Sequence, residues 1–137
     1  MQYRELAKEL LIKHEGYRER MYKDSLGIIT IGIGHNIQEK GLRPDEIDLI
    51  FENDLNEAEE AARKLVPNFE NLSDTRKGVI LDISFNLGET KFRKFVNTLK
   101  AIREERWEDA ARGFEDSLWY RQVGNRAKTL MKLWIEG

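Results

Sequence analysis

The stretch of sequence that decides the fold is HEGYRERMYKDSLGIITIGIGH, residues 14–35. It places two carboxylates, Glu15 and Asp24, nine residues apart, and a hydroxyl at Thr30 six residues further on. A Gly-Ile-Gly-His run closes the stretch at His35. No other part of the chain gathers so many reactive groups into so few residues, so we expect the functional site here.

The same stretch predicts a small β-hairpin. Residues 21–22 and 28–31 are of β type, and the Asp-Ser-Leu-Gly sequence at 24–27 between them is typical of a turn. The pattern leaves room for a third short strand. Gly32 and Gly34 allow the backbone to pass close to another strand or to a ligand.

A helix is predicted on the N-terminal side of this stretch, over residues 3–14. Its apolar face recurs at helical spacing, and Gly16 is placed where glycine commonly follows a helix. Glu15 then lies at the negative end of the helix dipole, which favours the protonated carboxyl that a general acid needs. The apolar positions are Tyr3, Leu6, Ala7, Leu10 and Leu11.

Further helices are predicted on the C-terminal side. Pro44 suits the first turn of a long helix over 44–65, and Ser73 suits the N-cap of a helix over 74–87 that ends before Gly88. The chain is therefore expected to be a mostly helical α+β protein with one small antiparallel sheet. Three shorter helices are predicted at 95–104, 107–117 and 124–135, and we interpret Trp107, Trp119 and Tyr120 within them as core.

The composition is typical of a globular protein, and the length fits one domain. The 137 residues are 40% hydrophobic and 35% charged, and cysteine is absent, so disulfides contribute nothing to stability. No apolar run reaches the roughly 20 residues that span a bilayer. We expect no stable membrane insertion and no cleavable secretory signal.

Charge is unevenly distributed, although its sum is only −2. Residues 1–60 carry 8 Lys and Arg against 14 Asp and Glu, whereas residues 61–137 carry 15 against 11. Ordinary solvated helix faces explain this difference, and so does a mildly basic C-terminal part facing an acidic polymer. A nucleic-acid partner is not expected, because such proteins show a denser basic patch.

The chemistry of residues 15–30 is that of glycosidic bond cleavage, which generally needs two carboxyl groups. Spacing alone leaves surface charge as the alternative for Glu15 and Asp24. Nine extended residues span on the order of 30 Å, so the pair can act on one sugar only if the chain reverses between them. Gly16 and the following turn permit that reversal.

Several ordered motifs strengthen the catalytic reading. The run YKDSLGIITIGIGH at 22–35 resembles the signature of the phage-type lysozymes, or endolysins, of glycoside hydrolase family 24. The resemblance covers nearly the whole chain. It continues through DISFNLGET at 82–90, FVNTL at 95–99, RWEDAA at 106–111, WYRQ at 119–122 and NRAK at 125–128.

The resemblance implies a lysozyme-like two-lobed fold in a single domain, residues 1–137. The small lobe would cover about 13–50 and contain the β-hairpin, and a long connecting helix would cover about 44–65. A helical C-terminal lobe would cover about 66–137, with helix 3–14 packing on it. The chain lacks a segment between Ile37 and Pro44 that longer members of the family have.

The resemblance also implies roles for individual residues. Glu15 would be the general acid, while Asp24 and Thr30 would hold or activate the attacking water. Asp24 as a nucleophile stays an alternative. Supporting roles would fall to Arg126, which would pair with Glu15, and to His35, which would pair with Asp54. No metal site or cofactor is expected, because the only other histidine is His14.

Substrate-binding positions follow from the same resemblance at Gly34, Asn36, Phe85 and Thr98. Phe85 could equally be core. Two positions depart from the family pattern, because Gly113 stands where the family has an asparagine and Asn36 where it has a leucine. Saccharide subsites away from the cleaved bond are therefore expected to differ.

The implied function is hydrolysis of the β-1,4 bond between N-acetylmuramic acid and N-acetylglucosamine in bacterial peptidoglycan, with inversion. A lytic transglycosylase, a catalytically silent cell-wall-binding module and a helical interaction domain are the alternatives. We expect a monomeric, bacteriolytic enzyme. It would stay in the host cytoplasm until a separate pore-forming protein releases it to the wall, and a designed sequence would have no native location.

Overall fold

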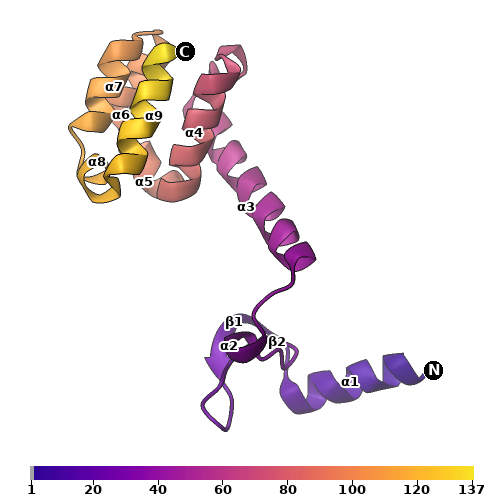
Figure 1. Ribbon diagram of the computed structural model, residues 1–137. Coiled ribbons are helices and arrows are strands. Elements are labelled where there is room, and N and C mark those ends of the chain that lie inside the picture. The colour runs from indigo at the N-terminus through magenta and orange to yellow at the C-terminus, as the bar shows by residue number, and fades with distance from the viewer. Residues whose placement is uncertain (1) are drawn as a thin grey trace. The chain divides into compact units, whose positions relative to one another are not determined.

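The computed structural model describes residues 2–137, and these form two compact units (Figure 1). The first unit ends at Asp48 and the second comprises Leu49–Gly137. The boundary falls inside the long helix α3 (Pro44–Leu65). The described residues are mostly helical with one two-stranded antiparallel sheet, which confirms the expected α+β class.

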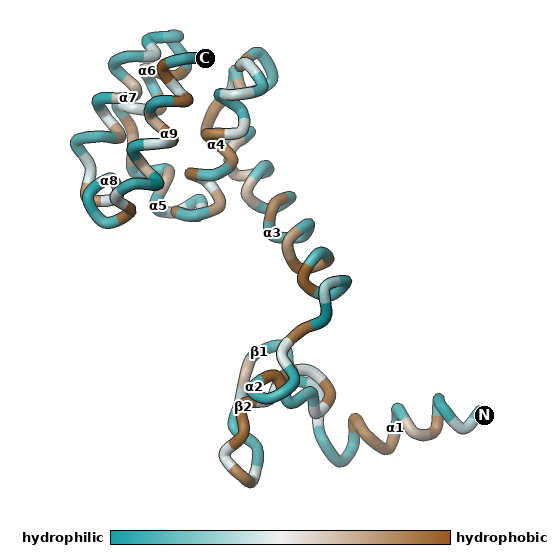
Figure 2. The backbone as a smooth tube through the Cα atoms, viewed as in Figure 1, coloured by the Kyte–Doolittle hydropathy of each residue, from teal (hydrophilic) through white to brown (hydrophobic). Residues whose placement is uncertain are grey.

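The first unit contains α1 (Tyr3–Glu15), β1 (Arg18–Lys23), β2 (Ile29–Gly32) and the short helix α2 (Ile37–Lys40). The helix predicted over 3–14 and the hairpin are thus confirmed. Apolar stretches recur between polar ones along α1 (Figure 2), as expected for an amphipathic helix. The packing of α1 on the C-terminal part stays a prediction.

The hairpin pairs β1 with β2 in antiparallel register, and Tyr22 lies opposite Thr30. The register is irregular between Arg18 and Tyr22 of β1. Within residues 2–137 the third strand does not form. In its place, a single bridge joins Ile31 to His35.

The second unit is helical. The predicted bounds at 74–87, 95–104, 107–117 and 124–135 agree with the observed helices to within a few residues, and Ser73 caps α4 by accepting from the Arg76 N–H at 3.1 Å. The second unit contains most of α3, the 3-10 turn η1 (Phe69–Asn71), α4 (Asp74–Leu87), α5 (Glu89–Arg93), α6 (Val96–Arg103), α7 (Trp107–Glu115), α8 (Leu118–Val123) and α9 (Asn125–Glu136).

The core of the second unit is aromatic. Trp134 is fully buried and donates from its indole Nε1 to the Trp107 carbonyl at 2.9 Å, and the two rings meet edge to face. Trp119 is also buried and donates to Asn86 Oδ1 at 2.7 Å. Trp107 and Tyr120 are partly buried against the same core, so the prediction that these aromatic residues are core is confirmed.

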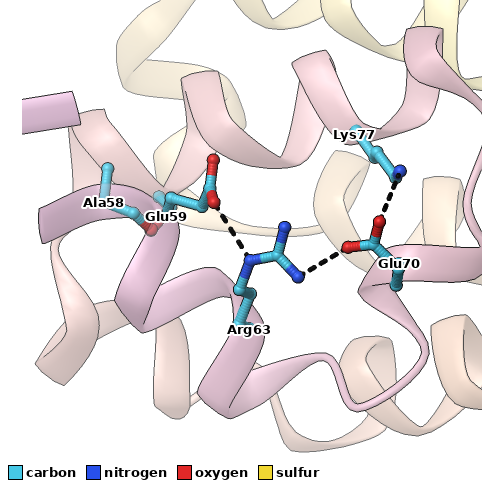
Figure 3. Close-up of polar contacts among 6 residues, drawn as sticks. Ala58, Glu59, Arg63, Glu70 and Lys77 are labelled. Atoms are coloured by element: carbon cyan, nitrogen blue, oxygen red, sulfur yellow. Dashed lines mark hydrogen bonds and ion pairs between the residues drawn. The ribbon is translucent and has the colours of Figure 1, made fainter. Parts of the chain in front are cut away.

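Polar contacts join α3, η1 and α4 (Figure 3). Arg63 of α3 donates to Glu70 of η1 at 2.7 Å and to Glu59 at 3.0 Å, and Lys77 of α4 lies 3.7 Å from Glu70. Deeper in the same interface, the Ser84 hydroxyl donates to the Ala58 carbonyl at 2.7 Å. Among residues 2–137, no helix combines the length and the apolar character that a bilayer crossing requires.

Candidate active site

Glu15 is the last residue of α1. Gly16 ends the helix with φ +87° and donates its N–H to the Ile12 carbonyl at 2.9 Å. From β1, the Tyr22 hydroxyl donates to the Glu15 carbonyl at 3.3 Å. The backbone of Gly34 lies against the Glu15 side chain. The predicted helix end therefore holds a carboxylate with neighbours from β1 and from the loop after β2.

Asp24 begins the turn of the hairpin. Its Oδ1 accepts from the Leu26 N–H at 2.8 Å and from the Ile28 N–H at 2.9 Å, and its carbonyl accepts from Gly27 at 3.0 Å. Gly27 adopts φ +80°, which glycine reaches without strain. These bonds leave Oδ2 of the half-buried carboxylate for another donor.

Thr30 lies on β2 and is only 4% exposed. Its hydroxyl donates to the Ile28 carbonyl at 3.0 Å. The same carbonyl accepts from the Asp24 N–H at 2.9 Å. One peptide group, that of Ile28, therefore binds both the turn that carries Asp24 and the hydroxyl of Thr30.

This arrangement determines what Thr30 can offer a water molecule. A hydroxyl has one proton and two lone pairs, and the proton of Thr30 is given to the Ile28 carbonyl. Towards water the hydroxyl is thus an acceptor, as is Oδ2 of Asp24. A water that donates to both would keep its own lone pairs for attack on carbon.

His35 and Asn36 follow the Gly-Ile-Gly run. His35 exchanges backbone hydrogen bonds with Ile31, both at 2.9 Å, and its Nε2 lies 2.8 Å from the Gly41 carbonyl. Asn36 caps α2, because its Oδ1 accepts from the Glu39 N–H at 3.0 Å and its Nδ2 donates to the Glu39 carboxylate at 3.1 Å. Both polar atoms of the Asn36 amide are therefore hydrogen-bonded within the cap. The substrate-binding role of Asn36 stays a prediction.

Asp54 and Phe85 lie in the second unit and line one groove there, with a volume of about 550 Å³. Phe85 is 41% exposed, and its ring centroid lies 6.0 Å from that of Phe51. Phe85 is therefore a groove residue and not plain core. The other lining residues are Glu57, Ala58, Glu60, Ala61, Ser84, Gly88 and Glu89.

Thr98 is buried on α6 and lines a second, shallower groove of about 420 Å³ together with Gly113. A Cβ added at Gly113 would collide with the Thr98 hydroxyl and lie 3.1 Å from its Cβ. Gly113, one of the two departures from the family pattern, thus leaves the room that the Thr98 side chain occupies.

Arg126 lies in the first turn of α9 and pairs with Asp82 of α4. Its Nε and Nη2 donate to Asp82 Oδ1 at 3.0 and 2.7 Å. The predicted pairings of Arg126 with Glu15 and of His35 with Asp54 each join residues of the two units, and both stay predictions.

Two contributors were missed at the level of sequence. Ile28 acts through its peptide group, which no side-chain pattern reveals. Asp82 lies 44 residues from Arg126, and the pair is recognisable only once α4 and α9 pack together. The Asp-Ser-Leu-Gly turn was the available signal for Ile28, since an Asp at a turn commonly accepts from N–H groups that follow it.

In this mostly helical chain, a helix end and the adjoining hairpin carry two carboxylates and a hydroxyl. These are the groups that a glycoside hydrolase uses. Comparison with known protein families identifies the group. The phage lysozyme family matches residues 12–133, and the chain belongs to this family.

Several known proteins are similar to the chain. "Probable T4-type lysozyme 1" of Dictyostelium discoideum is 28% identical over 92% of this chain and 91% of that protein. "Pre-baseplate central spike protein Gp5" of Enterobacteria phage T4 is 27% identical over 94% of this chain, which matches 27% of the longer protein. "Peptidoglycan hydrolase gp36" of Pseudomonas phage phiKMV is 29% identical over 89% of this chain and 14% of its own length.

Proposed function

We propose that this lysozyme hydrolyses the β-1,4 bond between N-acetylmuramic acid and N-acetylglucosamine in bacterial peptidoglycan, with inversion at the sugar carbon. Membership of the phage lysozyme family supports the reaction class, and a relative named as a peptidoglycan hydrolase supports the substrate. Storage in the cytoplasm and release by a separate pore-forming protein stay predictions.

In the proposed reaction, Glu15 gives its proton to the glycosidic oxygen, and the bond from that oxygen to the anomeric carbon breaks. Water attacks the carbon from the opposite face. The water gives one proton to Oδ2 of Asp24 and keeps the other, which is hydrogen-bonded to the Thr30 hydroxyl. The products are two shorter glycans, one with a new reducing end of inverted configuration.

The observation that carries this proposal is the shared Ile28 carbonyl, which accepts from both the Asp24 N–H and the Thr30 hydroxyl. It leaves Oδ2 of Asp24 and the Thr30 hydroxyl as acceptors, the groups that the proposed water would use. A lytic transglycosylase uses one acid and no water, so it has no use for this pair of acceptors.

The test is clearing of a peptidoglycan suspension by the Glu15→Gln variant. Glutamine keeps the shape of the side chain but cannot donate the proton, and general acid catalysis is worth about 10²–10⁴-fold. We expect a loss of that size with an unchanged circular dichroism spectrum. Glu9→Gln removes the same charge from another exposed position of α1 and should clear at the normal rate.

Analysis of the products separates the alternatives. Hydrolysis leaves reducing ends, and NMR at early times should show the inverted anomer. A transglycosylase leaves an anhydro ring that is lighter by one water. Full clearing by Glu15→Gln would refute the proposed role of Glu15. If the wild-type protein bound peptidoglycan without cleaving it, the alternative of a catalytically silent wall-binding module would be correct.

A further inference from the structure

Gly34 lies against the full length of the Glu15 side chain. A Cβ added at Gly34 would be 3.0 Å from both Cβ and Cγ of Glu15 and 3.2 Å from its carboxyl carbon. Real Cβ atoms rarely approach other atoms so closely, so any residue with a side chain at this position would push Glu15 aside. The contact involves the carboxyl group itself as well as its aliphatic stem.

The loop that carries Gly34 is held from two sides. Ile31 and His35 exchange two backbone hydrogen bonds of 2.9 Å across the loop, and the His35 ring lies 2.8 Å from the Gly41 carbonyl. The loop cannot easily retreat from Glu15, because retreat would break these bonds. The Gly34 backbone is therefore held in place against the Glu15 side chain.

The main chain of Glu15 is fixed as well. Gly16 closes the end of α1 by donating to the Ile12 carbonyl, and the Tyr22 hydroxyl donates to the Glu15 carbonyl. With the main chain fixed and one side blocked by Gly34, fewer rotamers remain open to the Glu15 side chain. A flexible glutamate otherwise loses substantial rotamer freedom when it is ordered for catalysis.

We propose that Gly34 is a positioning residue for Glu15, and that its missing side chain sets where the acid carboxyl stands. This inference rests on the proposed role of Glu15 as the general acid. It goes beyond the substrate-binding role expected for Gly34, because the glycine acts on the reaction through Glu15 and not through the sugar.

The chain contains a matched control two residues away. Gly32 has φ +68° and Gly34 has φ +65°, so an alanine at either position meets nearly the same backbone strain. A Cβ added at Gly32, however, finds no atom within 4 Å. The difference between Gly34→Ala and Gly32→Ala therefore isolates the contact with Glu15.

The experiment measures kcat and KM of both variants on soluble peptidoglycan strands, with thermal unfolding as a check on folding. We expect similar falls in Tm, but a kcat roughly 10-fold lower for Gly34→Ala than for Gly32→Ala, because a Cβ at Gly34 would shift Glu15 by a few tenths of an ångström and a shift of about 1 Å can cost about 10²-fold. KM should be alike in the two variants. Equal kcat values would overturn the inference, as would a difference confined to KM, which would assign Gly34 to substrate binding.

A double-mutant cycle adds a second measurement. If Gly34 acts only through Glu15, Gly34→Ala should not lower the residual kcat of Glu15→Gln any further. An additive loss would overturn the inference, whereas full activity of Glu15→Gln alone would overturn the proposed function instead. If the alanine variants do not fold, Gly34→Asn and Gly32→Asn give the same comparison, since asparagine tolerates positive φ better.

Discussion

At the scale of single residues, the direction of one hydrogen bond decides what Thr30 can do. Its hydroxyl donates to the Ile28 carbonyl, so it can only accept from a water. Thr30→Val keeps the shape but loses the acceptor, and clearing of peptidoglycan should fall roughly 10²-fold. The cost in the free energy of unfolding should be only about 0.5–1.5 kcal/mol, because the Ile28 carbonyl keeps the Asp24 N–H as a donor.

Thr30→Ser is the matched control for that experiment. Serine restores the hydroxyl without the methyl group, so it should recover most of the activity lost in Thr30→Val while packing less well on β2. Clearing by Thr30→Val at the normal rate would show that Thr30 is only a buried strand residue.

The turn of the hairpin was predictable because its hydrogen bonds are local, whereas the catalytic roles of Asp24 and Thr30 rest on the family resemblance and stay predictions. Asp24 accepts from N–H groups two and four residues on, and Thr30 donates two residues back. Gly34 was predicted to allow a close backbone approach to a strand or a ligand. Its neighbour is instead the Glu15 side chain, 19 residues away, and nothing in the local pattern distinguishes Gly34 from Gly32.

At the scale of elements, Glu70 holds η1 between α3 and α4 (Figure 3). A hydrogen bond from Arg63 and the charge of Lys77 lower the pKa of Glu70 from its ordinary value of 4.5. Because the folded pKa is the lower one, this stabilisation is present above about pH 4.5 and is lost as the pH falls through the folded value. Glu70→Gln should therefore lower the free energy of unfolding at pH 7 and have a vanishing effect in strong acid.

Urea unfolding at a series of pH values from about 7 downwards measures this difference. Glu115→Gln is the control, since Glu115 is an exposed acid that makes no ion pair within the described residues. A Glu70→Gln cost that does not change with pH would contradict an ionic role and leave only packing.

The long helices were predictable and the shortest ones were not. Helices α1, α3, α4 and α9 span three or more turns, so their apolar periodicity and their caps are visible in the sequence. Helices α2, α5 and α8 have four to six residues and show too little of a helical period to be recognised. The Asn36 cap on α2 and the Ser117 cap on α8 were readable signals, and Asn36 was read as a substrate contact instead.

At the scale of the whole molecule, net charge governs how the enzyme meets an anionic wall. The chain carries −2 at pH 7 and its isoelectric point is about 5.8. Moderate salt should speed clearing at pH 7 by screening repulsion, and slow it at about pH 5, where the protein is positive and attracted. Initial clearing rates at several salt concentrations and both pH values would show the reversal.

A neutral soluble glycan serves as the control for that reversal, because its cleavage should respond little to salt at either pH. The same sign of salt effect at both pH values would contradict control by net charge. The ion pairs of the second unit include Arg106 with Asp109, whose side chains are 45% and 40% exposed. They favour the reading of the C-terminal charge as ordinary solvated helix faces.

The bonds made by the Ile28 peptide group have a consequence for how freely this region can vary. Leu26 and Ile28 hold Asp24 through their N–H groups, and the Leu26 side chain is 82% exposed. The Leu26 side chain can thus be exchanged widely without disturbing the carboxylate, whereas proline is excluded at both positions, because it has no N–H. The exposed side chain beside Asp24 is therefore open to redesign. The position of the Asp24 carboxylate is set by hydrogen bonds from the main chain.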